Sequence, residues 1–157
     1  MESTSAPQLR VLALYSSLPN NQLSEAFRPT PPGMRKVVIS TNIAETSVTI
    51  PGIKYVIDSG KVKAKSYNPS TGLDMLKVQS ISQAQAWQRT GRAGRDSNGF
   101  CYRIYTKDEF DKFQKNTLPE IQRCNLASVA LQLLTLGINI YNFDFMTKPP
   151  KEVSNFK

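Results

Sequence analysis

The stretch richest in groups that could do chemistry is Gln88-Arg-Thr-Gly-Arg-Ala-Gly-Arg95. Each guanidinium group is a planar fork that donates two parallel hydrogen bonds to a phosphate and keeps its charge near neutral pH. If the segment is helical, steps of three and four residues place a polar and cationic stripe along one face. The stripe consists of Gln85, Gln88, Arg92 and Arg95. Such a stripe is suited to binding phosphate groups.

The presence of two glycines within this predicted helix needs a separate explanation. Inside a helix, Gly91 and Gly94 each cost about 1 kcal/mol relative to alanine. The close approach of another chain or of a ligand would explain them. The alternative is a surface helix whose arginines pair with acids elsewhere. The nearest upstream acid is Asp74, and that alternative leaves the glycines unexplained.

The elements that must position this segment alternate between strands and helices. Strands are expected at residues 11–15, 36–40, 55–58 and 100–105, and helices at 20–27 and 82–95. Continuous β-branched runs are typical of strands that are covered on both faces, as in a parallel sheet. The pattern therefore predicts an α/β layered domain with a mainly parallel sheet.

A β-hairpin is expected at residues 61–78, because turn residues at 68–72 separate two strand-like runs. Lys61, Lys63 and Lys65 alternate with smaller residues, so their ammonium groups share one face of the first strand. That face can meet phosphates. A solubilising edge strand, whose lysines discourage aggregation, explains the same pattern equally well.

A second unit is expected after the α/β domain. Residues 106–109 have capping-box spacing and predict a short helix that ends near residue 114. A further helix is expected to end at Gly137. Its predicted core residues are Leu126, Val129, Ala130, Leu133 and Leu134. We expect a truncated second domain from residue 115, with a tail after Pro149.

Composition limits the classes of function. The 157 residues carry a net charge of +8, and the acid-free tracts suggest polyanion partners, although a solvated basic surface without function explains the charge as well. The absence of histidine excludes imidazole bases and His-ligated metals. Cys101 and Cys124 form no Cys-x-x-Cys pair, which fits a reduced intracellular compartment. The sequence contains neither an apolar run long enough to cross a bilayer nor a recognisable secretion signal, so we expect no membrane partner.

Three segments resemble motifs of one family. Gln88 to Arg95 is similar to motif VI of superfamily 2 helicases, and Ser40-Thr-Asn-Ile-Ala-Glu-Thr-Ser-Val-Thr-Ile50 resembles motif V of the DEAH-box RNA helicases. Leu12-Ala-Leu-Tyr-Ser-Ser-Leu-Pro19 resembles motif IV of the same branch. The resemblance covers residues 11–149. It implies a second RecA-like lobe with helices on both faces of its sheet at 1–114, and the beginning of a winged-helix domain at 115–157.

The resemblance also implies roles for individual residues. Arg92 and Arg95 are similar to the arginine fingers that contact the γ-phosphate of ATP, and Gln88 would position that phosphate or the attacking water. Thr41 and Asn42, just past a strand end, match residues that bind RNA phosphates or riboses. An ordinary helix cap explains this pair as well.

Three further positions are implied to bind the nucleotide. Ser47 and Thr49 match motif V residues that respond to it, and Phe27 matches an aromatic residue that stacks on the base. By residue type alone, Phe27 is more typical of a core anchor. Pro51 departs from the family, because many members carry there an aspartate that accepts a ribose hydroxyl hydrogen bond. Proline has neither a carboxylate nor a backbone donor, so ribose recognition at this position is in doubt.

The sequence contains neither a phosphate loop nor an Asp-Glu-Ala-His box. We therefore expect this chain to be inactive alone, with ATP or another NTP and its Mg²⁺ held by a first lobe that the chain lacks. The implied partners are RNA, that first lobe, the C-terminal domains of the full-length protein and an activator protein. A nuclear or nucleolar location is expected over a cytoplasmic one. The rival hypotheses are a non-catalytic RNA-binding adaptor and a scaffold that recruits activating proteins.

Overall fold

The computed structural model describes residues 6–150, which divide into two compact units. Within the described part, the first unit comprises residues 6–60 and 81–115, and the second comprises residues 61–80 and 116–150. The predicted domain boundary after residue 114 stays a prediction, and the predicted tail lies, from residue 151 onward, outside the described residues.

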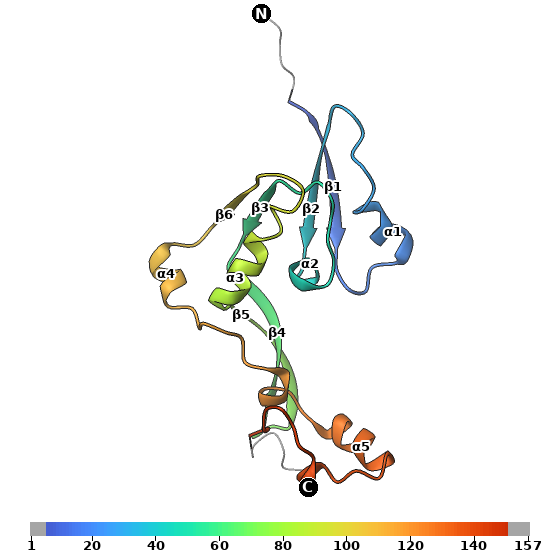
Figure 1. The fold of residues 1–157 in the computed structure, drawn as a ribbon, viewed down its shortest axis with the longest axis vertical. Helices are drawn as coiled ribbons and strands as arrows, with labels where there is room; N and C mark the ends of the chain where they lie inside the picture. The colour runs from blue at the N-terminus through green and yellow to red at the C-terminus, as the bar shows by residue number, and fades with distance from the viewer. Residues whose placement is uncertain (1–5, 151–157) are drawn as a thin grey trace, which may run out of the picture. The chain divides into compact units, whose positions relative to one another are not determined.

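The first unit alternates strands and helices, as the sequence pattern predicts (Figure 1). Strand β1 pairs in parallel with β2, and β3 pairs in parallel with β6. Hydrogen bonds join these strands as two separate pairs within the described residues. In chain order the elements are β1 (Gln8–Leu14), α1 (Asn20–Glu25), β2 (Met34–Ser40), α2 (Ile43–Thr46), β3 (Tyr55–Asp58), α3 (Gln83–Thr90), β6 (Phe100–Arg103) and α4 (Lys107–Asp111). The predicted α/β class with parallel strands is confirmed.

Helix α3 begins with a complete capping box. The Ser82 side chain accepts a hydrogen bond from the Gln85 backbone N–H, and the Gln85 side chain accepts one from the Ser82 backbone N–H. The helix ends at Thr90, with Gly91 as its C-cap. The predicted continuation to Arg95 is wrong, because two glycines in four residues weaken the helix. The chain then folds back on itself, so that a Cβ at Gly99 would lie 1.9 Å from the Ala93 carbonyl oxygen.

The strands of the first unit bury some side chains and expose others in alternation. Exposed apolar side chains include Val11 (57%), Ile39 (65%) and Ile57 (74%). Leu14, at the end of β1, is fully buried. Because successive side chains of a strand point to opposite faces, the described chain covers one face of these strands more fully than the other.

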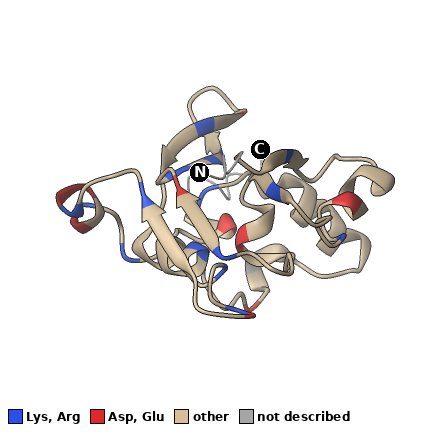
Figure 2. Ribbon diagram, turned by 90° about the horizontal axis from the view of Figure 1, so that it is seen from above, with Lys and Arg blue, Asp and Glu red and all other residues tan. Residues whose placement is uncertain are grey.

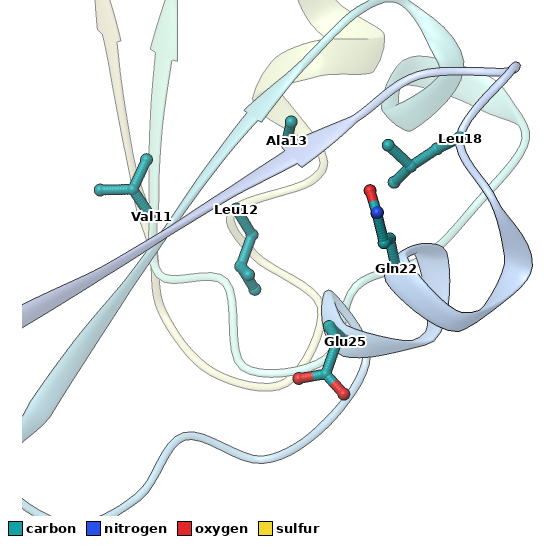
Figure 3. A pocket seen from close by; sticks show the side chains of 6 residues that line it. All are labelled: Val11, Leu12, Ala13, Leu18, Gln22 and Glu25. Carbon is teal, nitrogen blue, oxygen red and sulfur yellow. The ribbon is translucent and has the colours of Figure 1, made fainter.

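A shallow hollow of about 190 Å³ lies between β1 and α1 (Figure 3). It is lined by Val11, Leu12, Ala13, Leu18, Gln22 and Glu25. The Glu25 carboxylate already pairs with the guanidinium groups of Arg10 and Arg28. An apolar hollow whose charged group is an already paired carboxylate is poorly suited to a phosphate.

The second unit contains the predicted hairpin. Strands β4 (Lys61–Asn68) and β5 (Leu73–Ser80) pair antiparallel in the register Lys61↔Ser80 to Asn68↔Leu73. The remaining elements are η1 (Glu120–Gln122), α5 (Ala127–Thr135) and η2 (Ile140–Asn142). Helix α5 ends as expected, because Gly137 has φ +73° and the Ile138 N–H donates to the Leu133 carbonyl oxygen at 2.9 Å.

The predicted core face of α5 is only partly correct. Leu126 and Ala130 are each 6% exposed and lie in the core of the unit. Leu134 is 59% exposed and Val129 is 36% exposed. The described part of this unit supplies apolar partners for one side of the helix and leaves the rest in solvent. None of the helices within residues 6–150 has the length and apolar character that crossing a membrane requires.

Candidate functional site

The segment that resembles motif V leaves β2 and forms a short helix. The Thr41 N–H donates to the Leu14 carbonyl oxygen at 3.1 Å, which fixes the segment to the end of β1. Asn42 occupies the N-cap position of α2, but its side chain makes no cap hydrogen bond. Both Thr41 and Asn42 are exposed. Helix capping therefore does not account for the Asn42 side chain, and both side chains are accessible to a ligand.

The middle of this segment is anchored by a buried acid. Glu45 is 6% exposed and lies on α2. Its Oε1 accepts a hydrogen bond from Gln85 Nε2 at 3.0 Å, and its Oε2 accepts one from Arg89 Nε at 2.9 Å. Helix α3 therefore holds α2 through two side chains one turn apart.

Arg89 also reaches the end of strand β3. Its Nη1 donates to Asp58 Oδ1 at 2.8 Å, and Asp58 is 2% exposed. The second carboxylate oxygen, Oδ2, accepts the Tyr105 hydroxyl at 2.8 Å, and the Gly60 N–H donates to Oδ1 at 3.0 Å. A Cβ at Gly60 would lie 2.6 Å from the Tyr105 ring, so glycine is required beside this network. The network joins α2, α3, the last residue of β3 and the residues just past β3 and β6.

The electrostatics of this network follow from burial and charge. Burial lowers the pKa of the Arg89 guanidinium, but hydrogen bonds with Asp58 and Glu45 together outweigh it, so that the pKa is raised. Burial, followed by the hydrogen bond to Asp58, raises the pKa of Tyr105 above its ordinary value. The network is therefore two carboxylates sharing one guanidinium, with a neutral tyrosine as an additional donor.

The two arginines that follow α3 lie against the other end of the motif V segment. Arg92 Nη1 donates to the Val48 carbonyl oxygen at 3.1 Å, and Arg95 Nη1 donates to Thr49 Oγ1 at 2.5 Å. Neither arginine forms an ion pair with a carboxylate among the described residues. Burial, and then the charge of Arg95, lower the pKa of Arg92. Two guanidinium groups thus lie close together and keep their positive charge.

The turn that carries Pro51 is tied to the same loop. The Gly52 N–H donates to Asp96 Oδ2 at 2.7 Å. Asp96 directly follows Arg95 in the chain. The loop after α3 therefore contacts the motif V segment and the turn after it at three places, through Arg92, Arg95 and Asp96.

The glycines of the motif VI segment are not crowded. A Cβ at Gly91 would make only ordinary contacts with the preceding helix backbone, and one at Gly94 would meet nothing within 4 Å. Nothing within the described chain crowds either glycine, and the predicted close approach of another chain or of a ligand stays a prediction. The space beside Gly94 is open.

The structure brings some of the predicted residues together and leaves others apart. Arg92 and Arg95 contact the end of the motif V segment. Within that segment, the Ser47 hydroxyl lies 3.4 Å from that of Thr46. Gln88 is exposed on α3.

Phe27 follows the end of α1 and is half-buried. Lys36 Nζ donates to the carbonyl oxygens on either side of it, those of Ala26 at 2.9 Å and Arg28 at 3.0 Å. Burial, and then the charge of Arg10, lower the pKa of Lys36. The backbone around Phe27 is therefore held by β2, while the residue itself stays partly accessible.

The lysines of the hairpin lie on one face of β4 in the second unit, as expected from their alternation. Two of them already have partners. Lys65 pairs with Asp74 at 2.8 Å, and the hydrogen bond and charge of that partner raise the pKa of Lys65. Lys61 Nζ donates to Ser80 Oγ at 3.2 Å. Lys63 is exposed and lies opposite Val78 in the register. Figure 2 shows the basic and acidic residues along the ribbon.

Sequence reasoning missed the buried network. For Arg89, the alternative of an arginine paired with acids elsewhere is the correct one, since its partners lie 44 and 31 residues upstream. The distance in sequence between Asp74 and the arginines does not show whether an arginine has an acidic partner, because the fold brings the ends of distant strands together. The available signal is Asp58 at the carboxyl end of an apolar strand, where a lone acid needs a partner. Within residues 6–150, no cluster of metal-ligating side chains is present.

Comparison with known proteins places this arrangement in a family. Residues 1–97 match the family described as Helicase conserved C-terminal domain. The mouse protein named ATP-dependent RNA helicase DHX33 is 64% identical over 144 residues, which cover 91% of this chain and 21% of the mouse protein. The Schizosaccharomyces pombe pre-mRNA-splicing factor ATP-dependent RNA helicase prp22 is 52% identical over 154 residues, covering 97% of this chain and 13% of that protein.

The fold agrees with the sequence comparison. A crystal structure of the Escherichia coli DEAH/RHA helicase HrpB matches 94% of this chain and 19% of its own, at a TM-score of 0.87 and 36% identity. The chain thus spans about a fifth of the length of the first curated relatives that it matches. Its strands and helices are those of a RecA-like helicase lobe, and the chain belongs to the Helicase conserved C-terminal domain family.

Proposed function

We propose that this chain is the second motor lobe of an ATP-dependent DEAH-box RNA helicase, and that Arg92 and Arg95 act as its arginine fingers. The observation that carries the proposal is their placement. Both guanidinium groups are oriented by neutral oxygens, those of Val48 and Thr49, and no described carboxylate forms an ion pair with them. Charge held in position and left unpaired is what stabilises a transferring phosphoryl group.

Gln88 is proposed to position the γ-phosphate or the attacking water. Ser47, Thr49 and Phe27 are proposed to contact the nucleotide, with Phe27 stacking on its base. The phosphate loop and the acidic box that would hold ATP and Mg²⁺ are proposed to lie in the first lobe, since this sequence contains neither. The chain alone would therefore not hydrolyse ATP.

Thr41 and Asn42 are proposed to bind single-stranded RNA. Both are exposed and stand at the start of α2. Hydroxyl and amide groups at such a place can reach phosphates and riboses. In the second unit, Lys61, Lys63 and Lys65 are proposed to contact the RNA backbone, with Lys63 the strongest contributor because Lys65 is paired with Asp74.

The other proposed partners belong to the full-length protein. They are its first lobe, its C-terminal domains, of which residues 115–157 would begin a winged-helix domain, and an activator protein. A nuclear location is proposed, supported by relatives named as pre-mRNA-splicing factors.

The proposal is tested by measuring ATP hydrolysis by the full-length protein and by residues 1–157 alone, each with and without single-stranded RNA. We expect the full-length protein to hydrolyse ATP faster with RNA, and the chain alone to be inactive. The rival is an RNA-binding adaptor. It predicts no ATP hydrolysis by the full-length protein and RNA binding that is independent of nucleotide and weakens steeply with salt.

A further inference from the structure

Asp96 carries an exposed carboxylate in the loop after α3, directly after Arg95 in the chain. Its Oδ2 accepts a hydrogen bond from the Gly52 N–H at 2.7 Å, which fixes the carboxylate beside the turn that follows the motif V segment. Its Oδ1 accepts no hydrogen bond from the residues that the structure describes. One carboxylate oxygen is therefore held in place, and the other is left for a further donor.

This carboxylate is not a counterion for the neighbouring arginines. Arg92 and Arg95 bind neutral oxygens, and none of the ion pairs within residues 6–150 includes Asp96. A negative charge does not attract a phosphate, because like charges repel. A carboxylate is instead a strong acceptor for hydroxyl groups, which are neutral donors. The ribose of a nucleotide offers such hydroxyls, and in dinucleotide-binding folds an acidic side chain accepts one of them.

The positions of Arg95 and Asp96 follow the order of the groups in a nucleotide. Arg95 contacts Thr49, and Asp96 contacts Gly52, three residues farther along the chain. A proposed phosphate contact is thus followed by an acceptor, as the phosphates of a nucleotide are followed by its ribose. A Cβ at Gly52 would meet nothing within 4 Å. The described chain therefore leaves space beside this turn.

The turn has no acidic side chain of its own. Residues 50–52 are Ile, Pro and Gly, and Pro51 also lacks a backbone N–H. The Asp96 carboxylate reaches this turn across 44 residues of sequence. We propose that Asp96 is a specificity-determining residue, whose second carboxylate oxygen accepts a hydrogen bond from a ribose hydroxyl of the nucleotide. The inference rests on the proposed function and assigns to this residue the discrimination between ribonucleotides and deoxyribonucleotides.

The test measures nucleotide binding instead of hydrolysis. Isothermal titration calorimetry gives the dissociation constants of the full-length protein for ADP, 2′-deoxy-ADP and 3′-deoxy-ADP, each with Mg²⁺. Each analogue lacks one hydroxyl, so the comparison isolates the contact that this hydroxyl makes. The variant is Asp96→Ala, and the control is Asp111→Ala, which removes an exposed carboxylate from α4.

We expect the wild-type protein to bind ADP about tenfold more tightly than at least one of the two analogues, the usual worth of a hydrogen bond to a charged group. Asp96→Ala should weaken ADP binding and remove this preference, because the acceptor for the hydroxyl is gone. Asp111→Ala should keep the preference. If Asp96→Ala does not fold, Asp96→Asn gives the same contrast, since its amide oxygen keeps the bond to the Gly52 N–H and its amide nitrogen cannot accept a hydrogen bond.

Two results would overturn the inference and leave the proposed function standing. One is a preference for ADP that stays unchanged in Asp96→Ala, because a residue that only holds the Gly52 turn affects all three nucleotides alike. The other is equal affinity of the wild-type protein for the three nucleotides. A wild-type protein that binds none of them would instead overturn the proposed function itself.

Discussion

The Arg92 guanidinium donates a hydrogen bond to the Val48 carbonyl oxygen at 3.1 Å, across 44 residues of sequence. This bond connects the loop after α3 to the segment after α2. Because its acceptor is a neutral backbone oxygen, it orients the guanidinium and leaves its charge for another partner. The contact between Arg95 and Thr49 has the same character.

Arg89 differs from both arginines, because its partners are charged and buried. Replacing it with methionine leaves Glu45 and Asp58 without their counterion. We expect Arg89→Met to lower the free energy of unfolding by about 3 kcal/mol, the usual cost of breaking a buried ion pair from one side. Urea unfolding followed by circular dichroism measures this loss. Arg35→Met, at an exposed position on β2, is the control and should change little.

Tyr105 is expected to make the stability of the fold depend on pH in the alkaline range. Its pKa is raised in the folded state, by burial and by the bond to Asp58, so the folded chain favours the protonated phenol. The resulting stability is complete below the unfolded pKa of about 10 and is lost as the pH rises above it. We expect Tyr105→Phe to reduce this alkaline loss, measured as the melting temperature between neutral pH and pH values above about 10. An unchanged alkaline slope would contradict the assignment, and Tyr102→Phe, at an exposed position, is the control.

Thr41 is expected to matter for RNA and not for the fold. Its side chain is exposed, so replacing it with valine removes a hydrogen-bonding group at nearly constant shape. We expect Thr41→Val to weaken RNA binding by the full-length protein by about 1 kcal/mol, the usual worth of one hydrogen bond. Fluorescence anisotropy with a labelled single strand measures the affinity. An unchanged affinity would remove Thr41 from the proposed RNA contacts.

The hairpin offers a matched pair of lysines. Lys63 is exposed on β4, whereas Lys65 is paired with Asp74. We expect Lys63→Ala to weaken RNA binding and to reduce the slope of log affinity against log salt by about 1, as for one lost phosphate contact. Lys65→Ala should change both quantities less. Equal effects would mean that the Asp74 pair opens when RNA binds.

Those parts of the fold that depend on local pattern are predictable from the sequence. The strands ending at Ser40 and Asp58 follow from β-branched runs, and the hairpin follows from its turn residues. The predicted end of α3 is wrong, since tertiary bonds and the two glycines decide it together. The pairing of Arg89 with Glu45 and Asp58 is not predictable from local pattern, because it depends on which strand ends the fold brings together.

The proposal that Arg92 and Arg95 act as arginine fingers is tested most directly by the ATPase rate of the full-length protein. The variants are Arg92→Ala and Arg95→Ala, and Arg35→Ala is the exposed control. If these guanidinium groups contact the γ-phosphate, each substitution lowers kcat on the order of a thousandfold, and the control stays near wild type. A kcat near the wild-type value in both variants would contradict the account.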